Sequence, residues 1–565
     1  MRFGWFLGGA TAATFAFMGC SDDPATNGDV SSSSSGGSSS SSSGSGEIAQ
    51  TSSSGKPSSS SSSSGGKTSS SSSSGGSSSS SGGKTDGGAG TDGGTGTDGG
   101  ASGVTTIKSG EVYLVGTTKD GQIVFTTAAN NNKRQVEAAP VNGGASTVIA
   151  SVDDDADVIV AGNAVLYWTD VDPNAVIGTV NVWTKAAGAK VNVATNSIPG
   201  YGDASEDGSK IMFSFNSPGD TADFAITSPG APQAVASATT GIIPNVNVVA
   251  QTCAASFGFV AKAFVSVHCP GNGQGLTKAS LVYLPDAASP TPVTLIDGTP
   301  TANSLKPGFT VNKSGTRVAV IGITSSQLRV VTLAGGATAT IENNVGYAFL
   351  NDDASKVIYR KTDNSLWSAA SVNNSTPAAT PAGATNLVAA GGIAGVLDVS
   401  PNSAYAVFRK LAPVGAADNF PRSDLNLIDT TTAAQAGTAL VATATGGVAG
   451  FTDTSSHVLY MADMAGGSGI GKLKARSVAG GAERDVAASA GLVRTIGGGT
   501  KVTFMGNPQV VGQVATVDIS VFDAANNVAP TLLVTGADPY YEVSSGKVVF
   551  VKPGVAGGLY VTQVP

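Results

Sequence analysis

Few residues of this 565-residue chain are suited to acid–base, nucleophilic or metal chemistry. It has two histidines, His268 and His457, and neither stands in a context typical of a Ser-His-Asp triad or of a metal site. We expect structural roles for both, with His457 at the edge of a turn. No Gly-x-Ser-x-Gly motif with a hydrolase domain follows. The sequence therefore favours a non-enzymatic protein that needs no cofactor.

The densest acidic stretch is the one candidate for a metal site. It consists of Asp153, Asp154, Asp155 and Asp157. Oxygen-rich loops suit calcium, so these residues are weak candidates for its ligands. Exposed carboxylates in a turn between two strands are the commoner arrangement, and we expect that arrangement here.

Two cysteines in the body, Cys253 and Cys269, form an even pair. In an exported protein such a pair indicates a disulfide, and two free buried thiols are the alternative. Residues 257–267 read as strand, so the cysteines could bracket a hairpin. Its centre, residues 260–262, is a poor turn sequence, and the turn could instead lie at residues 256–258. Adjacent strands joined by a longer path are a further possibility.

The N-terminus carries an export signal. Arg2 precedes an apolar segment over residues 3–18, which is too short to span a bilayer comfortably. The segment ends in Phe17-Met18-Gly19-Cys20, which resembles a lipobox, although Phe17 stands where leucine is usual. The resemblance implies that residues 1–19 are a lipoprotein signal peptide and that Cys20 carries the lipid. It also implies, through Ser21, sorting to the outer membrane of the cell envelope.

Residues 20–104 follow as a low-complexity linker of Ser, Gly, Thr, Asp and Lys. Such a segment cannot bury enough apolar surface to offset its chain entropy, so we expect disorder. A Gly/Ser chain of about 80 residues spans on the order of 50 Å. Three Thr-Asp-Gly-Gly repeats near its end lack the apolar positions of a calcium-binding β-roll, and we interpret them as linker.

Residues 105–565 show the pattern of an all-β domain. Short apolar runs bounded by Gly, Asn, Asp and Ser recur, and few windows have a helical period. A turn cluster followed by a strand with an aromatic or large aliphatic residue returns every ~40 to ~55 residues, the spacing of four-stranded blades. Only the interval from Phe213 to Val320 is about twice as long, and it could hide one more copy. The copies lie at 119–125, 163–168, 206–213, 312–320, 352–359, 400–408 and 453–460, with weaker ones ending at Phe504 and Phe550.

This unit resembles the Ser-Pro-Asp-Gly-x-x-Ile-x-Phe repeat of TolB-like propellers, which also occurs in the propeller of prolyl oligopeptidases. Residues 205–213 and 400–408 match best, whereas Ala354, Ser403 and Ser455 replace the glycine. The resemblance to TolB-like and WD-repeat-like proteins implies one β-propeller of seven or eight four-stranded blades, possibly more, with two smaller propellers as the alternative. We expect residues 559–561 to close the ring with residues 112–115.

The formal charge of −8 argues against nucleic-acid binding, which needs basic patches. The sequence therefore predicts an envelope lipoprotein, attached to the membrane through lipid, that displays a non-enzymatic propeller to a protein or glycan partner. One alternative is an envelope lyase or hydrolase with its site in the channel mouth. Another is a TolB-like component of an envelope assembly.

Overall fold

The computed structural model describes the body of the chain from residue 103 onward. Between residues 214 and 309 only the backbone of the strands is described. Within residues 103–565 the segments outside the description are 173–176, 218–220, 228–241, 247–256, 261–262, 269–278, 285–292, 299–308, 313–315, 322–325, 334–337, 352, 372–383, 390–392, 412–422, 442–446, 465–468, 512–513 and 555.

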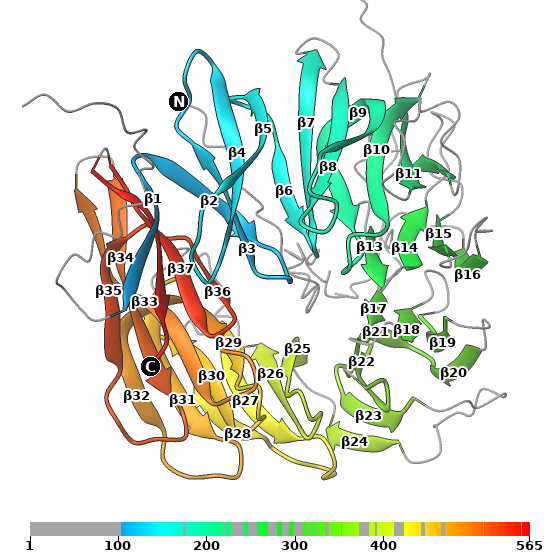
Figure 1. Ribbon diagram of the computed structural model, residues 1–565. Coiled ribbons are helices and arrows are strands. Elements are labelled where there is room, and N and C mark those ends of the chain that lie inside the picture. The colour runs from blue at the N-terminus through cyan, green and yellow to red at the C-terminus, as the bar shows by residue number, and fades with distance from the viewer. Residues whose placement is uncertain are drawn as a thin grey trace, which may run out of the picture. The chain divides into compact units, whose positions relative to one another are not determined.

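The described residues form antiparallel β-sheets and contain no helix (Figure 1). Six sheets have four strands and two have seven. No described helix is therefore available that could pass through a lipid bilayer. The all-β class predicted from the apolar runs is confirmed, and the succession of four-stranded antiparallel units is propeller-like.

The four-stranded sheets mostly follow the chain order. One of them joins both ends of the body: β1 (Val104–Ser109), β38 (Gly558–Gln563), β37 (Lys547–Lys552) and β36 (Tyr541–Ser544). The others are β2 (Val112–Thr117), β3 (Gln122–Thr127), β4 (Lys133–Pro140) and β5 (Thr147–Asp153); β13 (Phe257–Val260), β14 (Ala263–His268), β15 (Ala279–Leu284) and β16 (Val293–Gly298); β17 (Phe309–Val311), β18 (Arg317–Ile321), β19 (Leu328–Thr332) and β20 (Thr338–Glu342); β21 (Val345–Leu350), β22 (Lys356–Lys361), β23 (Leu366–Ala370) and β24 (Thr385–Val388); and β25 (Ile393–Val399), β26 (Tyr405–Leu411), β27 (Ser423–Asp429) and β28 (Thr438–Val441).

The seven-stranded sheets each contain two units that share one long strand. The first comprises β6 (Val158–Ala161), β7 (Ala164–Asp172), β8 (Ile177–Thr184), β9 (Val191–Ala204), β10 (Ile211–Ser217), β11 (Thr221–Thr227) and β12 (Ile242–Val246). The second comprises β29 (Gly447–Phe451), β30 (His457–Ala462), β31 (Gly471–Ser477), β32 (Arg484–Thr495), β33 (Lys501–Val511), β34 (Val514–Asp523) and β35 (Thr531–Ala537).

The shared strands β9 and β32 change partner at one residue. The first half of β9 pairs with β8 and its second half with β10, and Ser197 lies at the change. Ala490 has the same place in β32, where it pairs with Gly471 of β31 and Gly506 of β33. Both residues are fully buried. If each seven-stranded sheet counts as one unit, the described body has eight units; if each counts as two, it has ten. The number of blades therefore stays a prediction.

The turn-and-strand copies in the sequence correspond to the second strand of each unit. Residues 123–125 of β3, 406–408 of β26 and 458–460 of β30 are fully buried, as a central strand packed on both faces requires. The long interval between Phe213 and Val320 contains β14, the second strand of the sheet β13–β16. A further copy therefore does lie in that interval.

The apolar cores lie between consecutive sheets. One core combines Val112 and Phe125 with Val549 and Leu559 of the sheet that joins both ends of the body. Others fill the spaces between β21–β24 and β25–β28 and between β25–β28 and the sheet that starts with β29. Face-to-face packing of consecutive sheets is how propeller blades bury their apolar side chains.

The strand that meets the C-terminal strand differs from the expected one. β38 pairs with β1, with Val104 opposite Thr562 and Ser109 opposite Gly558. Residues 112–115, the expected partner, belong to β2 and pair with β3 instead. The prediction was wrong by one strand because residues 104–109, with four polar positions out of six, give a weaker strand signal than Val112-Tyr113-Leu114-Val115.

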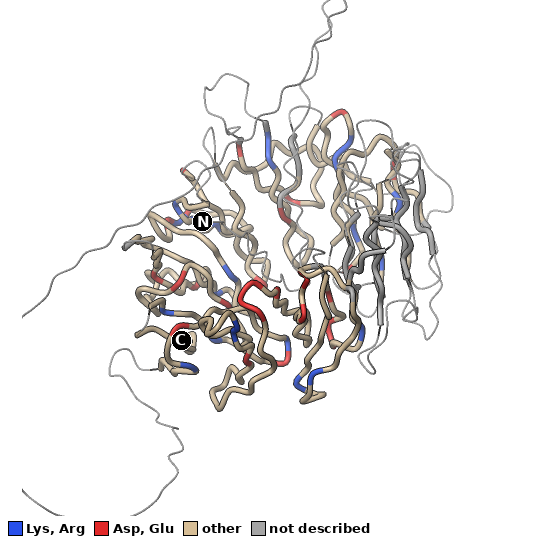
Figure 2. Tube along the Cα trace, turned by 90° about the horizontal axis from the view of Figure 1, so that it is seen from above, with Lys and Arg blue, Asp and Glu red and all other residues tan. Residues whose placement is uncertain are grey.

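Charges of both signs are interspersed along the described chain (Figure 2). Several form partly buried ion pairs between neighbouring sheets, such as Lys361 Nζ with Glu342 Oε2 at 2.9 Å and Lys108 Nζ with Glu137 Oε1 at 2.9 Å. Glu342 and Glu137 are almost fully buried, and burying a carboxylate is costly unless it is paired, so each lysine offsets part of that cost.

Candidate functional site

The candidate residues from the sequence fall partly outside the described structure. Cys20, Cys253 and Cys269 all do, so lipidation and the disulfide stay predictions. The strands between the two body cysteines are described, and they form a tight hairpin in which Val260 pairs with Ala263. Residues 257 and 258 lie within β13, so the alternative turn at residues 256–258 is wrong.

The acidic stretch at residues 153–157 is engaged with neighbouring cations. Asp153 Oδ1 lies 2.6 Å from Lys133 Nζ. Burial raises the pKa of Asp157, and the nearby Arg134 guanidinium opposes that rise. Arg134 also donates to the carbonyl oxygen of Ala156. In the part of the chain that the structure describes, no three His, Cys, Asp or Glu side chains converge as metal ligands would.

His457 takes part in a turn network. Its Nδ1 lies 3.0 Å from Ser456 Oγ, and burial lowers its pKa. The nearest carboxylate, Asp523, instead accepts hydrogen bonds from Thr500 Oγ1 at 2.5 Å and from the Ala525 amide at 3.1 Å. A relay needs the carboxylate to hold the imidazole, so this is not the geometry of a Ser-His-Asp triad. His268 lies in β14, opposite Ser280.

The hairpin turns before the second strands share one hydrogen-bonding pattern. In the turn at 205–210, Ser205 Oγ accepts the Lys210 amide at 2.9 Å, and Asp207 Oδ1 accepts the Ser209 amide at 3.0 Å. The fourth position, Gly208, has φ +72°. The turns at 351–356 and 400–405 repeat these bonds, with Asn351 or Ser400 first and Asp353 or Asn402 third.

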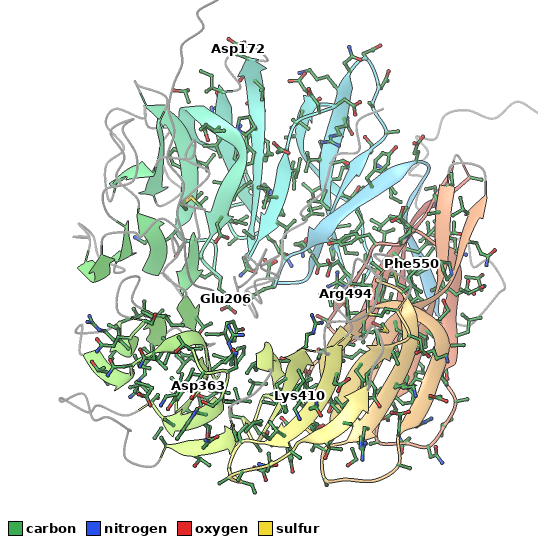
Figure 3. All side chains as sticks on the ribbon, turned by 180° about the vertical axis from the view of Figure 1, so that it is seen from behind. Asp172, Glu206, Asp363, Lys410, Arg494 and Phe550 are labelled. Carbon is green, nitrogen blue, oxygen red and sulfur yellow. The ribbon has the colours of Figure 1, made fainter. Side chains whose placement is uncertain are left out.

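Neighbouring turns are bonded to one another. The Asp120 amide donates to Asn163 Oδ1 at 2.8 Å, and the Asn163 amide donates to the Glu206 carbonyl oxygen at 3.1 Å. Lys119 Nζ adds an ion pair to Glu206 Oε1 at 2.6 Å. Figure 3 shows Glu206 toward the inner side of the sheets.

The same linkage recurs later in the chain. The Asn402 amide donates to Ser455 Oγ at 2.9 Å, and the Gly498 amide donates to Asp453 Oδ2 at 2.7 Å. We call this set of linked turns the turn belt. It comprises two linked groups, at 118–122, 161–164 and 205–210 and at 400–405, 452–457 and 496–501, together with the turn at 351–356, which shares the internal bonding pattern.

A second polar cluster joins β32 to β36. Arg494 Nη2 lies 3.3 Å from Glu542 Oε1, and the guanidinium lies over the rings of Tyr540 and Tyr541 at 5.8 and 5.7 Å. Tyr540 Oη donates to the same carboxylate. Burial, and secondarily Glu542, raises the pKa of Tyr540, so the phenol stays protonated at neutral pH. No sequence pattern predicted this cluster, because its residues come from separate repeats.

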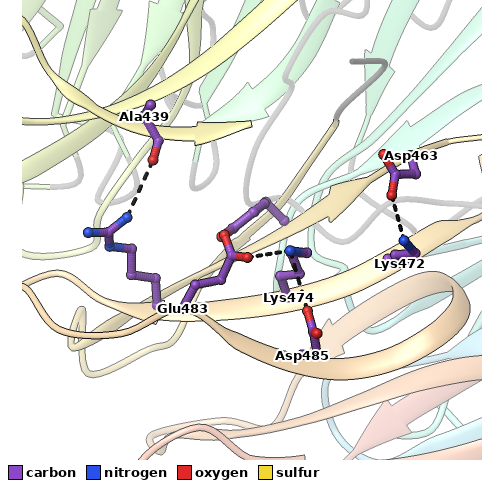
Figure 4. Close-up of polar contacts among 8 residues, drawn as sticks. Ala439, Asp463, Lys472, Lys474, Glu483 and Asp485 are labelled. Atoms are coloured by element: carbon purple, nitrogen blue, oxygen red, sulfur yellow. Dashed lines mark hydrogen bonds and ion pairs between the residues drawn. The ribbon is translucent and has the colours of Figure 1, made fainter. Parts of the chain in front are cut away.

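A third polar group lies on β31 and the segment after it (Figure 4). Glu483 accepts hydrogen bonds from Lys474 and from the buried Tyr460, and Lys474 Nζ also lies 3.3 Å from Asp485 Oδ1. Burial alone would raise the pKa of Glu483, but the bonds from Lys474 and Tyr460 lower it. Lys472 and Asp463 form a separate exposed pair at 2.8 Å.

Comparison with known proteins gives no family. No family model and no curated protein matches the chain. A prolyl endopeptidase structure shares 11% identity at a TM-score of 0.35, covering 74% of this chain and 55% of that one, so this chain corresponds to about half of that enzyme. A TolB structure from Agrobacterium tumefaciens shares 11% identity at 0.23, covering 49% and 94%.

The β-propeller domain of Myceliophteria thermophila Cps50 (Swd1) shares 9% identity at a TM-score of 0.26, covering 65% of this chain and 96% of that one. All three TM-scores are below 0.5, so these similarities carry no argument about activity. The propeller-like description of this chain rests on its own strand order and packing.

Proposed function

We propose that this chain is a lipid-anchored envelope protein whose β-body binds a protein or glycan partner at the turn belt. The observation that carries the binding role is the bonding between neighbouring turns, such as Asp120 to Asn163 and Asn402 to Ser455. Loops held by a rigid scaffold lose little conformational entropy on binding, so a fixed set of carboxylates, amides and hydroxyls suits recognition.

The anchor follows from the lipobox-like residues 17–20 and the Ser/Gly-rich linker after them. Lipoprotein maturation attaches several acyl chains to one cysteine, and each buried CH₂ contributes about 0.8 kcal/mol. The linker gives the body freedom to reach partners away from the membrane surface. Ser21 supports the outer membrane as its location.

We also infer that the units form a single ring. The pairing of β1 with β38 unites the two ends of the body in one sheet, which is how a circular array avoids loose terminal units. The shared strands β9 and β32 then join two pairs of units within that ring.

Membrane fractionation tests the anchor. We expect Cys20→Ala to release the protein from membranes washed with high salt, and Ser21→Asp to leave it bound but move it to the inner-membrane fraction. Retention of Cys20→Ala in washed membranes would contradict lipidation at this residue.

Site-specific photo-crosslinking in intact envelopes tests the binding face. A photoreactive residue in place of Glu206, on the turn belt, should give one discrete adduct. The same residue in place of Val148, which is 55% exposed on β5, is the matched control and should give none. Equal labelling at both positions, or none at Glu206, would rule out the turn belt as the binding face.

A further inference from the structure

We propose that the outer edge of β35 pairs with β35 of a second copy, so that the protein forms a symmetric dimer through continuous sheet. An edge strand exposes unpaired backbone N–H and C=O groups that another strand can satisfy. In the described structure β35 pairs with β34 on one side only and ends its sheet (Figure 1).

The outer strands of the other sheets carry features that oppose such pairing. Each has a charged residue or a proline, or is only four residues long, and these are recognised ways of protecting a sheet edge. The features are Lys108 in β1, Asp153 in β5, Pro244 in β12, Asp297 in β16, Glu342 in β20, and the four-residue length of β24 and β28.

β35 has none of these features. It is seven residues long, Thr-Leu-Leu-Val-Thr-Gly-Ala, without charge or proline. Leu532 is 54% exposed, and Val528 just before the strand is 66% exposed. Register shifts occur in its pairing with β34, but they also occur in the pairing of every other outer strand. The absence of charge therefore distinguishes this edge.

Most of the strand is held in an extended conformation, and Gly536 near its end has a positive φ of +66°. Its inward residues Val534 and Ala537 are buried in the core against β36–β38. The Arg484 guanidinium stacks 4.5 Å from the Phe522 ring and donates to the carbonyl oxygen of Val528, which fixes the entry to β35. A pre-ordered edge costs little entropy when it accepts another strand.

A second copy fits this edge by charge as well as by shape. An antiparallel partner places the start of its β35 beside the end of the first. The start lies next to Arg484 and the end is followed by the half-buried Asp538, so this arrangement would bring groups of opposite charge near each other twice across the two-fold axis. Leu532 of each copy then lies on the same face of one extended sheet. One seven-residue strand makes a small interface, so dimerisation should depend on concentration.

The test is the protein mass of the full-length chain in detergent, measured by light scattering with bound detergent subtracted. The wild type should approach twice the monomer mass as its concentration rises. Leu532→Lys/Thr535→Lys should remain monomeric, and so should Leu532→Glu/Thr535→Glu, because like charges oppose each other across the axis. An equimolar mixture of the two variants should regain the twofold mass. Val510→Lys, at a still more exposed apolar position on β33, is the control and should dimerise.

The proposal would be overturned if the wild type kept the monomer mass at concentrations up to ~1 mM, because a specific contact is populated at that concentration. The proposal would also be overturned if the Lys variant kept the twofold mass. The same holds if the mixture stayed monomeric while each variant had the melting temperature of the wild type.

Discussion

Val104, at the start of β1, pairs with Thr562, near the end of β38. Lys108 of the same strand also bonds to Glu137 of β4, in the next sheet. This short N-terminal strand therefore belongs to the packing of two sheets. Two truncations, one that ends before β1 and one that removes it, separate the contribution of β1 to the stability of the body from that of the linker.

Deletion of residues 1–109 should lower the melting temperature well below that of a chain that starts at Ser102. The longer truncation leaves one edge of β38 unpaired and removes the cation beside the buried Glu137. Thermal unfolding followed by circular dichroism, with a β-rich spectrum for both proteins, checks this. Equal melting temperatures would show that β1 adds nothing to the stability of the body.

Ser403→Gly should stabilise the protein. Ser403 has φ +59°, a conformation that costs a residue with a Cβ about 1–2 kcal/mol, and the equivalent position in another turn is Gly208. The greater freedom of glycine in the unfolded chain offsets part of this gain, so we expect about 0.5–1 kcal/mol in urea unfolding. Ser400→Gly is the control: it removes the acceptor of the Tyr405 amide and should destabilise by about 1 kcal/mol.

Asp353 should make stability depend on pH in the acid range. Hydrogen bonds from the hydroxyl and amide of Ser355 lower its pKa. A carboxyl group with a lowered folded-state pKa stabilises the protein above its unfolded value of about 4, and loses this contribution as pH falls through the folded value. Asp353→Asn should therefore be less stable than wild type at pH 7, with the difference shrinking below pH 4. Urea unfolding across that range measures it, and a difference independent of pH would contradict the assignment.

Cys253 and Cys269 should form a disulfide. The described hairpin pairs Phe257 with Ser266, so the strand ends that lead to the two cysteines lie side by side. A bond closing a loop of this size contributes roughly 3 kcal/mol through the unfolded state. Non-reducing peptide mapping of protein from the envelope should recover one linked peptide, and free thiols at both positions would exclude the bond.

The strand pattern was predictable because the second strand of each unit is packed on both faces. It must therefore be a continuous apolar run after a tight turn, as at Ile123-Val124-Phe125 and Ala406-Val407-Phe408. Even the departures from glycine at Ala354, Ser403 and Ser455 keep a positive φ. The hydrogen bonds of the turn thus hold the backbone in place when the residue type does not favour it.

Other features depend on contacts that no local pattern encodes. Arg494 and Glu542 lie on different sheets, and neither has a neighbour in sequence that signals the pair. The pairing of β1 with β38 was not predicted because β1 is mostly polar and is held by β38 and by the bond from Lys108 to Glu137. Only Ala261 and Lys262 separate the paired strands β13 and β14 in the sequence, and neither is a typical turn residue, so residue types alone did not predict where this hairpin reverses.

The shared strands β9 and β32 have a consequence for the order in which the body comes apart. Elsewhere, consecutive sheets are separate hydrogen-bonded ladders that meet through side-chain packing and single bonds between turns, such as Lys119 amide to Gly162 carbonyl oxygen at 3.1 Å, so one sheet can open while its neighbours persist. At Ser197 and Ala490 one strand pairs with a strand of one unit on one side and with a strand of the next unit on the other side. Amide protons on both sides of each residue should therefore exchange together, as one cooperative block of seven strands.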